Sequence, residues 1–209
     1  MVSEGEPVRV LIVDAQPSVR AWLPRVLGAE PRVRVVGEAG DAGRSIERAL
    51  LLQPDVVVMD PRLPGGSGVE ASRAIRSGHD GTRVLIHAAA GGDEALLAAV
   101  LAGAAGYVLK DLDAAPLVAA ILAAAEARPL LARAAVEPAA RRLMRLADRI
   151  AAPASIAGSP MDWRRVVANI VAGRSDGEIA ASLGGSEEGV RRFAALLFEA
   201  AAGRAALDG

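Results

Sequence analysis

The sequence predicts an α/β protein: a doubly wound, five-stranded parallel sheet, followed by a small all-α domain. Within residues 1–128, short apolar segments alternate with segments of helical periodicity, which is the pattern of successive strand–helix units. Val56–Met59 is apolar at every position and lies between proline-containing breakers, as is typical of a strand buried on both faces. After Pro129 the periodicity is helical only. Right-handed crossovers would then place helices on both faces of the sheet.

The individual elements follow from apolar spacing and from the breakers between them. Strands are expected at Val8–Val13, Val33–Val36, Val56–Met59, Val84–His87 and Gly106–Lys110. Helices are expected at Ser18–Leu27, from a cap at Asp41 to Leu52, and at Val69–Ile75, Asp93–Leu101 and Pro116–Ala127.

Composition narrows the class of protein. The 209 residues suffice for one large domain or two small ones, and with 52 % hydrophobic but only 2 % aromatic residues the core must consist of Ala, Val and Leu. The absence of cysteine excludes disulfides, thiolate metal sites and cysteine nucleophiles. No apolar run approaches the ~20 residues of a membrane span, and the acidic N-terminus is unlike a signal peptide. We therefore expect a cytoplasmic protein without a membrane partner.

Three charged residues stand where predicted strands end. Asp14 follows the first strand, Asp60 follows the third, and Lys110 ends the fifth. Ligands bind at the carboxyl edge of such a sheet, so these residues mark a candidate site. Lys110 is the only lysine among 24 basic residues, which indicates that a compact ammonium is required there. Alternatively, Asp60 begins an ordinary turn and Lys110 is a surface lysine retained by chance.

This arrangement of Asp14, Asp60 and Lys110 resembles the CheY-like receiver domain of bacterial two-component response regulators. The segment Ser175–Arg192 resembles the LuxR-type helix-turn-helix of the NarL/FixJ branch, so the similarity runs almost from end to end. It implies a receiver domain at 1–128, a linker helix and flexible linker at 129–157, and a DNA-binding domain at 158–209.

The resemblance also implies a chemistry for the first domain. Asp60 would be the phosphoacceptor, while Asp14, Asp60 and the backbone carbonyl of Arg62 would hold Mg²⁺, which needs only one or two carboxylates besides water. Lys110 would pair with the phosphoryl oxygen, because phosphoryl transfer depends mainly on positioning and charge neutralisation.

Two departures from the family pattern predict an atypical receiver. The family has two adjacent acids after the first strand, and Ala15 replaces the second, which weakens the Mg²⁺ site. Ala88 stands where a Thr or Ser hydroxyl senses the phosphoryl group, so the matching aromatic, Tyr107, would be uncoupled from Asp60. We therefore expect weak phosphorylation at Asp60 or none.

The second half predicts a linker helix and a helix-turn-helix. Residues 132–150 form an amphipathic pattern, and 151–158 a flexible stretch. Ser159, Pro160 and Asp162 are spaced as a capping box that would begin the next helix. The two helices of the motif are expected at Asp176–Leu183 and from Ser186 to about Ala200, joined by a glycine turn.

By the same resemblance, three residues would contact DNA. Ser186 would cap the recognition helix near a phosphate, and Arg191 and Arg192 would face the major groove, where arginine binds guanine in bidentate fashion. The alternative is that both arginines are solvated. From residue 158 onward, six arginines face seven acids, and Asp176 would repel phosphate, so attraction to DNA is local.

The predicted function is a transcription regulator of the response-regulator type that binds promoter DNA as a homodimer, with little or no dependence on phosphorylation. A sensor histidine kinase or a small-molecule ligand would control it. The alternative is a degenerate regulator that binds a protein or ligand without specific DNA binding. A haloacid-dehalogenase-like phosphatase would need Asp-x-Asp after the first strand, and Asp14-Ala15-Gln16 does not provide it, so we expect no enzyme.

Overall fold

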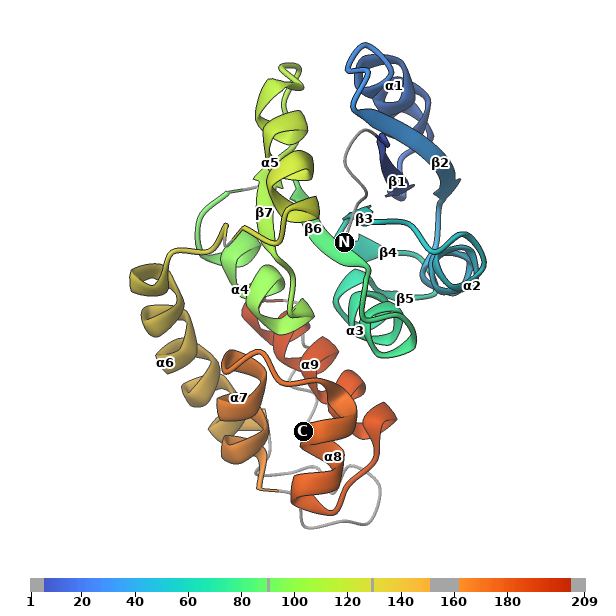
Figure 1. The fold of residues 1–209 in the computed structure, drawn as a ribbon. Coiled ribbons are helices and arrows are strands. Elements are labelled where there is room, and N and C mark those ends of the chain that lie inside the picture. The colour runs from blue at the N-terminus through green and yellow to red at the C-terminus, as the bar shows by residue number, and fades with distance from the viewer. Residues whose placement is uncertain (1–5, 90, 129, 151–161, 204–209) are drawn as a thin grey trace.

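The computed structural model describes residues 6–89, 91–128, 130–150 and 162–203. Its centre is a parallel five-stranded sheet in the order β2-β1-β3-β6-β7, which confirms the predicted doubly wound topology (Figure 1). The strands are β1 (Val8–Val13), β2 (Val33–Ala39), β3 (Val56–Met59), β6 (Arg83–Ala88) and β7 (Gly106–Leu109). β1 and β3 are neighbours at the centre, with Val13 opposite Met59. The residues that follow these two strands are thereby brought together.

Five helices cover the two faces of the sheet. They are α1 (Pro17–Leu27), α2 (Ala42–Leu52), α3 (Gly68–Gly78), α4 (Asp93–Ala102) and α5 (Ala115–Ala125). The Asp41 side chain accepts a hydrogen bond from the Arg44 N–H at 2.9 Å, as expected of the N-cap of α2. Each helix lies within two or three residues of its predicted bounds.

The alternation of side chains along the strands divides the core into two layers. Val10 and Ile12 of β1 face α1 and α5, where they pack with Leu23 and Ile121. Leu11 and Val13 face the opposite way, into the layer formed by α2, α3 and α4. Both layers consist largely of Ala, Val and Leu, as the composition predicts.

The connection between β3 and α3 contains a short pair of strands. β4 (Arg62–Leu63) and β5 (Gly66–Ser67) form a short antiparallel pair between β3 and α3. The pair has only two residues in each strand, too few for a period-2 pattern to be visible in the sequence. Pro64 and Gly65 connect the two strands, and Gly65 and Gly66 both have a positive φ, which glycine adopts without steric cost.

The remaining helices form the C-terminal part. They are α6 (Arg133–Ile150), α7 (Trp163–Val171), α8 (Asp176–Leu183) and α9 (Glu187–Ala201). The prediction of Asp162 as a capping-box partner inside the helix is wrong: Asp162 is itself the N-cap, accepting from the N–H groups of Arg164 and Arg165. Ser159 and Pro160 lie outside the described residues, as does the stretch 151–158. The boundaries 1–128, 129–157 and 158–209 stay predictions.

The C-terminal helices pack directly against the sheet domain. α9 contacts α3 and α4 of that domain as well as α6 and α8, and Figure 1 shows it between the two halves of the molecule. Its buried face includes Phe193, Leu197 and Phe198, which belong to the same apolar cluster as α3 and α4. Trp163 of α7 stacks on Phe193 with ring centroids 4.3 Å apart. The two halves therefore share one core.

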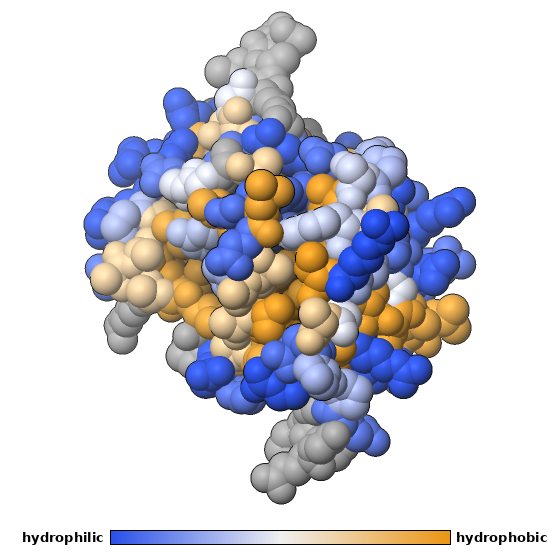
Figure 2. Space-filling model, turned by 90° about the horizontal axis from the view of Figure 1, so that it is seen from above, coloured by the Kyte–Doolittle hydropathy of each residue, from blue (hydrophilic) through white to orange (hydrophobic). Residues whose placement is uncertain are grey.

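The opposite end of the molecule carries an open groove between α1 and α5. Figure 2 views the molecule from that end and shows apolar side chains exposed among charged ones. Val26, Val118 and Leu122 lie in the groove, with Glu30 and Arg128 among its charged lining residues. Within the described part of the chain, no helix combines the length and apolarity that crossing a membrane requires.

Candidate functional site

The carboxyl edge of the sheet brings together the three residues predicted from strand ends. Asp14 and Asp60 follow the paired strands β1 and β3, and both are buried, at 1 % and 7 % exposure. The Asp60 N–H donates to the Val13 carbonyl, which ties the two strand ends together. Lys110 follows β7, and its N–H donates to the carbonyl of Ala88 at 2.8 Å. The fold thus supplies all three positions through backbone pairing.

The Lys110 ammonium lies between the two carboxylates. Its Nζ is 2.6 Å from Asp14 Oδ2 and 2.7 Å from Asp60 Oδ2. The other oxygens are also used: Asp14 Oδ1 accepts the Gln16 N–H, and Asp60 Oδ1 accepts the Arg62 N–H at 2.8 Å. A flexible ammonium reaches both carboxylates at once, which accounts for a lysine at this position in an arginine-rich chain.

The protonation equilibria reflect this burial and pairing. Burial raises the pKa of Asp60, and the hydrogen bonds from Lys110 and the Arg62 N–H offset this only in part. Burial lowers the pKa of Lys110, but its hydrogen bonds to Asp14 and Asp60 outweigh that effect, so the pKa lies above its usual value. The lysine therefore stays charged at neutral pH and balances one of the two carboxylates.

A cavity of about 180 Å³ opens onto Asp60 and Lys110. Ala15, Gln16, Ala88 and Glu94 are among its lining residues. The guanidinium of Arg62 forms an ion pair with Glu94 of α4, next to the cavity. Small side chains at positions 15 and 88 leave room beside Asp60 where the family pattern places an acid and a hydroxyl.

The donor set meets the minimum for Mg²⁺. Asp14 Oδ2 is buried, and the Lys110 ammonium is its one partner among the described residues. With Asp60 and the Arg62 carbonyl it would provide the hard oxygen ligands that Mg²⁺ prefers, and water would complete the octahedron. No group of three or more His, Cys, Asp or Glu side chains suited to a metal occurs among the described residues. Lys110 occupies the space between the carboxylates that a cation would share.

One residue assigned to the pocket does not line the cavity. Tyr107 on β7 is 37 % exposed and is not among the cavity's lining residues, so its role in the phosphoryl pocket stays a prediction. Ala88 does line the cavity but contributes only a methyl group.

Two residues near the site were not predicted. His87 on β6 is 3 % exposed, its Nδ1 has no hydrogen-bond partner among the described residues, and burial together with the Lys110 charge lowers its pKa to about 4. Gly68 begins α3 so close to Asp60 that an added Cβ would lie 2.0 Å from the Asp60 carbonyl oxygen. The absence of a side chain at Gly68 thus lets α3 begin close to the backbone of Asp60.

The second candidate site is the start of α9. Ser186 is its N-cap and accepts from the Gly189 N–H at 3.1 Å. Arg192 is exposed, as a DNA-contacting residue must be. Arg191 is not free: its side chain is 21 % exposed, and Nη1 lies 3.2 Å from Glu187 Oε2 and 3.5 Å from Asp176 Oδ2. The two predicted arginines therefore differ: Arg192 is exposed, whereas Arg191 is ion-paired and largely covered.

Asp176 connects this site to the sheet domain. Its side chain is 1 % exposed, and Oδ1 lies 2.6 Å from Nε and 2.5 Å from Nη2 of Arg73, which is 2 % exposed on α3. Arg73 also donates from Nη1 to the Leu101 carbonyl of α4 at 2.8 Å. An acid at position 176, which the sequence marks as unfavourable for DNA, is thus half of a buried ion pair between the two halves.

Comparisons with known proteins bear on both sites. A family model for the response regulator receiver domain matches residues 10–122. The DNA-binding transcriptional activator DevR/DosR of Mycobacterium tuberculosis is 43 % identical over 124 residues, which cover 59 % of this chain and 57 % of that protein. The match therefore spans little more than half of that relative's length.

Two further matches extend beyond this length, and one of them spans nearly the whole chain. The protein described as a probable transcriptional regulatory protein NarL of Mycobacterium tuberculosis is 33 % identical over 196 residues, covering 94 % of this chain and 88 % of that one. Among solved structures, a LuxR-family two-component response regulator from Aurantimonas sp. SI85-9A1 has a TM-score of 0.57 at 36 % identity, covering 69 % of this chain and 99 % of its own.

Proposed function

Because the chain belongs to the response-regulator family, we propose that it is a DNA-binding transcription regulator that acts in the cytoplasm and is not an enzyme. The observation that carries this proposal is the helix pair α8 and α9, which follows a receiver-type sheet. Ser186 caps the start of α9, and Arg192 on this helix is exposed. In a helix-turn-helix the second helix enters the major groove, and its early residues contact base edges. α9 is that helix, and Arg191 and Arg192 are its base-reading candidates.

The experiment is footprinting of the purified full chain on its own upstream region, with and without acetyl phosphate and Mg²⁺. We expect protection in both conditions. The variant with both Arg191→Ala and Arg192→Ala should lose specific protection. The matched control, Arg164→Ala with Arg165→Ala, removes the same charge from α7, where both side chains are exposed. Equal loss in the two variants would show that only net charge matters.

Absence of protection by the wild-type chain under either condition would favour the alternative, a regulator that acts by binding a protein or ligand. The excess of acidic residues over arginines in the last part of the chain is the observation behind that alternative. A screen of random genomic fragments with the same protein separates a missing target site from missing DNA binding.

Phosphorylation at Asp60 is proposed to be weak. The carboxylate is accessible from the cavity, and Lys110 is placed to neutralise a phosphoryl oxygen, but positions 15 and 88 offer only methyl groups. A sensor histidine kinase or a small-molecule ligand would then bias the protein through this same cavity. Protection that appears only with acetyl phosphate and Mg²⁺ would contradict weak dependence on phosphorylation.

Mg²⁺ is proposed to bind weakly, through Asp14, Asp60 and the Arg62 carbonyl. Ala15 lines the same cavity, so Ala15→Asp places a third carboxylate beside it. We expect Ala15→Asp to raise Mg²⁺ affinity by about tenfold, since ligand charge tunes such sites. Isothermal titration of the two chains with MgCl₂ measures the change. Equal affinities would show that Ala15 does not limit binding.

The active form is proposed to be a homodimer, because helix-turn-helix proteins commonly read two half-sites one helical turn apart. The groove between α1 and α5 is a face that a second copy can cover, since it combines apolar Val118 and Leu122 with charges of both signs. Light scattering on the wild-type chain and on Leu122→Glu tests this. A dimer unaffected by Leu122→Glu would place the interface elsewhere.

A further inference from the structure

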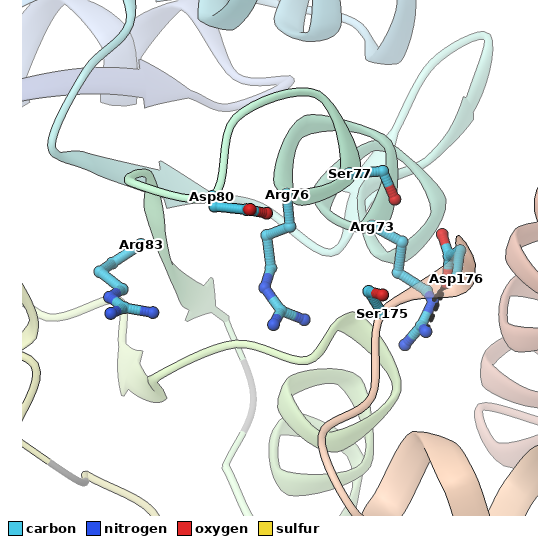
Figure 3. Close-up of a pocket in the computed structure, with 7 residues that line it drawn as sticks. All are labelled: Arg73, Arg76, Ser77, Asp80, Arg83, Ser175 and Asp176. Carbon is cyan, nitrogen blue, oxygen red and sulfur yellow. Dashed lines mark hydrogen bonds and ion pairs between the residues drawn. The ribbon is translucent and has the colours of Figure 1, made fainter. Parts of the chain in front are cut away.

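A second cavity, of about 50 Å³, lies where the sheet domain meets α8. Figure 3 shows its lining: Arg73, Arg76 and Ser77 come from α3, Asp80 from the turn before β6, Arg83 from the start of β6, and Ser175 and Asp176 from the start of α8. Three arginines therefore face one small space between the two halves.

The charges of these arginines are not balanced in the same way. Arg73 is paired with Asp176 and with the Leu101 carbonyl. Arg76 is half-buried, yet its guanidinium forms no hydrogen bond and no ion pair with any residue that the structure describes. In Figure 3 its side chain extends between Arg83 and Arg73, with Asp80 nearby. Burial and the neighbouring Arg73 lower the pKa of Arg76, as expected of like charges confined together.

The fold holds Arg76 in this position. Its Nη1 lies so close to Gly103 that an added Cβ there would come within 1.9 Å, and Gly103, with φ of 62°, is the C-cap of α4. The Arg76 side chain thus lies against the end of α4, where the Leu101 carbonyl accepts a hydrogen bond from Arg73. A partly desolvated guanidinium without an acceptor is costly, and guanidinium forks match the geometry of tetrahedral oxyanions.

We propose that this cavity binds a single tetrahedral oxyanion of the phosphate class, held by Arg76 and Arg83 with support from Arg73 and the Ser77 hydroxyl. The size of the cavity suits a few water molecules or one such anion and excludes a nucleobase. Asp80 and Asp176 are the acidic groups that face it, and Asp176 is already neutralised by Arg73.

The site has a consequence for the relation between the two halves. An anion bound to Arg76 and Arg83 would place a negative charge beside α3, and this charge attracts the positive amino-terminal end of α8. It therefore favours the arrangement in which α9 is packed against α3 and α4. The effect on DNA binding rests on the proposed function, whereas the binding of the anion does not.

The test is isothermal titration of the full chain with inorganic phosphate, at constant ionic strength maintained with chloride and without DNA. We expect saturable binding, weakened at least tenfold by Arg76→Gln and unchanged by Arg34→Gln, an equal charge change at an exposed residue of β2. Arg83→Gln, exposed and less critical for folding, keeps the test valid if Arg76→Gln does not fold.

Parallel titrations with glycerol phosphate distinguish the source of the anion. Binding of both ligands indicates a phosphate group whatever it is attached to, and binding of inorganic phosphate alone indicates the free anion. Absence of saturable binding, or equal weakening by Arg76→Gln and Arg34→Gln, would overturn the proposal. The arginines would then only balance the partial negative charge at the carboxyl end of α4.

Discussion

At the scale of single residues, Lys110 decides whether Asp14 and Asp60 can remain buried together. Lys110→Met leaves two carboxylates side by side without a counter-charge, so we expect a loss of about 3–5 kcal/mol in the free energy of unfolding at neutral pH. The loss should shrink on acidification, as the carboxylates become protonated. Urea unfolding of Lys110→Met and of the exposed control Arg34→Met measures the difference; equal losses would show that the three charges do not interact.

His87 gives the fold a pH dependence of defined sign. Its pKa is about 4 in the folded chain against 6.5 for the free side chain, so between these values the unfolded chain binds more protons and stability falls as the pH is lowered. The full difference corresponds to about 3 kcal/mol.

His87→Leu should therefore flatten the decline in stability from pH 6.5 to pH 4. Asp60, whose pKa is raised, contributes with the opposite sign in the acid range and is common to both chains. The readout is the difference in unfolding free energy between wild type and His87→Leu across that window. A constant difference would mean that His87 takes up its proton as readily in the folded chain as in the unfolded one.

Among the site residues, those at strand ends could be predicted because their positions depend on local pattern. An apolar strand followed by an acid fixes where Asp60 lies, and parallel pairing then brings Asp14 beside it. Tyr107 could not be placed in this way, since the pattern identifies its strand but not which face of the sheet it occupies. The lowered pKa of His87 could not be predicted, because the sequence does not show that an imidazole within a strand is buried beside Lys110.

At the scale of elements, the glycines differ in what they do. Gly68 starts α3 against the Asp60 carbonyl, where an added Cβ does not fit. At Gly43, in the first turn of α2, an added Cβ would lie 3.6 Å from its nearest neighbour, Asp41 Oδ1, which is an ordinary contact distance. Gly43 lies inside a predicted helix, and Gly68 directly precedes one. What distinguishes the two glycines is that α3 packs directly on the backbone at Asp60, after β3.

We expect opposite results from the same substitution. Gly43→Ala should raise the free energy of unfolding by up to about 1 kcal/mol through helix propensity. Gly68→Ala should lower it and displace the loop that carries Asp60, which would also weaken the pairing of Lys110. Thermal unfolding of both variants provides the comparison; stabilisation by Gly68→Ala would show that α3 does not approach Asp60 this closely.

At the scale of the whole molecule, the central feature is that α9, the proposed DNA-reading helix, is packed against the sheet domain. Its apolar face packs against α3 and α4, and the adjacent Arg73–Asp176 pair closes the contact. A helix with its side chains nearly fills the major groove, so the proposed binding of α9 to DNA requires that it first separate from the sheet domain. Arg191 must likewise leave Asp176 and Glu187.

This contact was beyond prediction from the sequence. Arg73 and Asp176 are 103 residues apart, and neither belongs to a motif that requires the other. The sequence shows the charge of Asp176, which predicts repulsion of phosphate, but it does not show that this side chain is buried and paired with Arg73. The two domain types could be predicted separately from local patterns, whereas their mutual arrangement depends on side chains that meet only after both have folded.

The most direct measurement is the affinity of full-length Arg73→Gln for a protected DNA site. Arg73 lies on α3, so the change leaves the DNA-binding helices intact and removes a positive charge, which by itself cannot strengthen binding to DNA. If the buried pair holds α9 against the sheet domain, Arg73→Gln should bind at least tenfold more tightly than wild type, and Arg34→Gln should match wild type. A folded Arg73→Gln chain that binds no better than wild type would contradict the account.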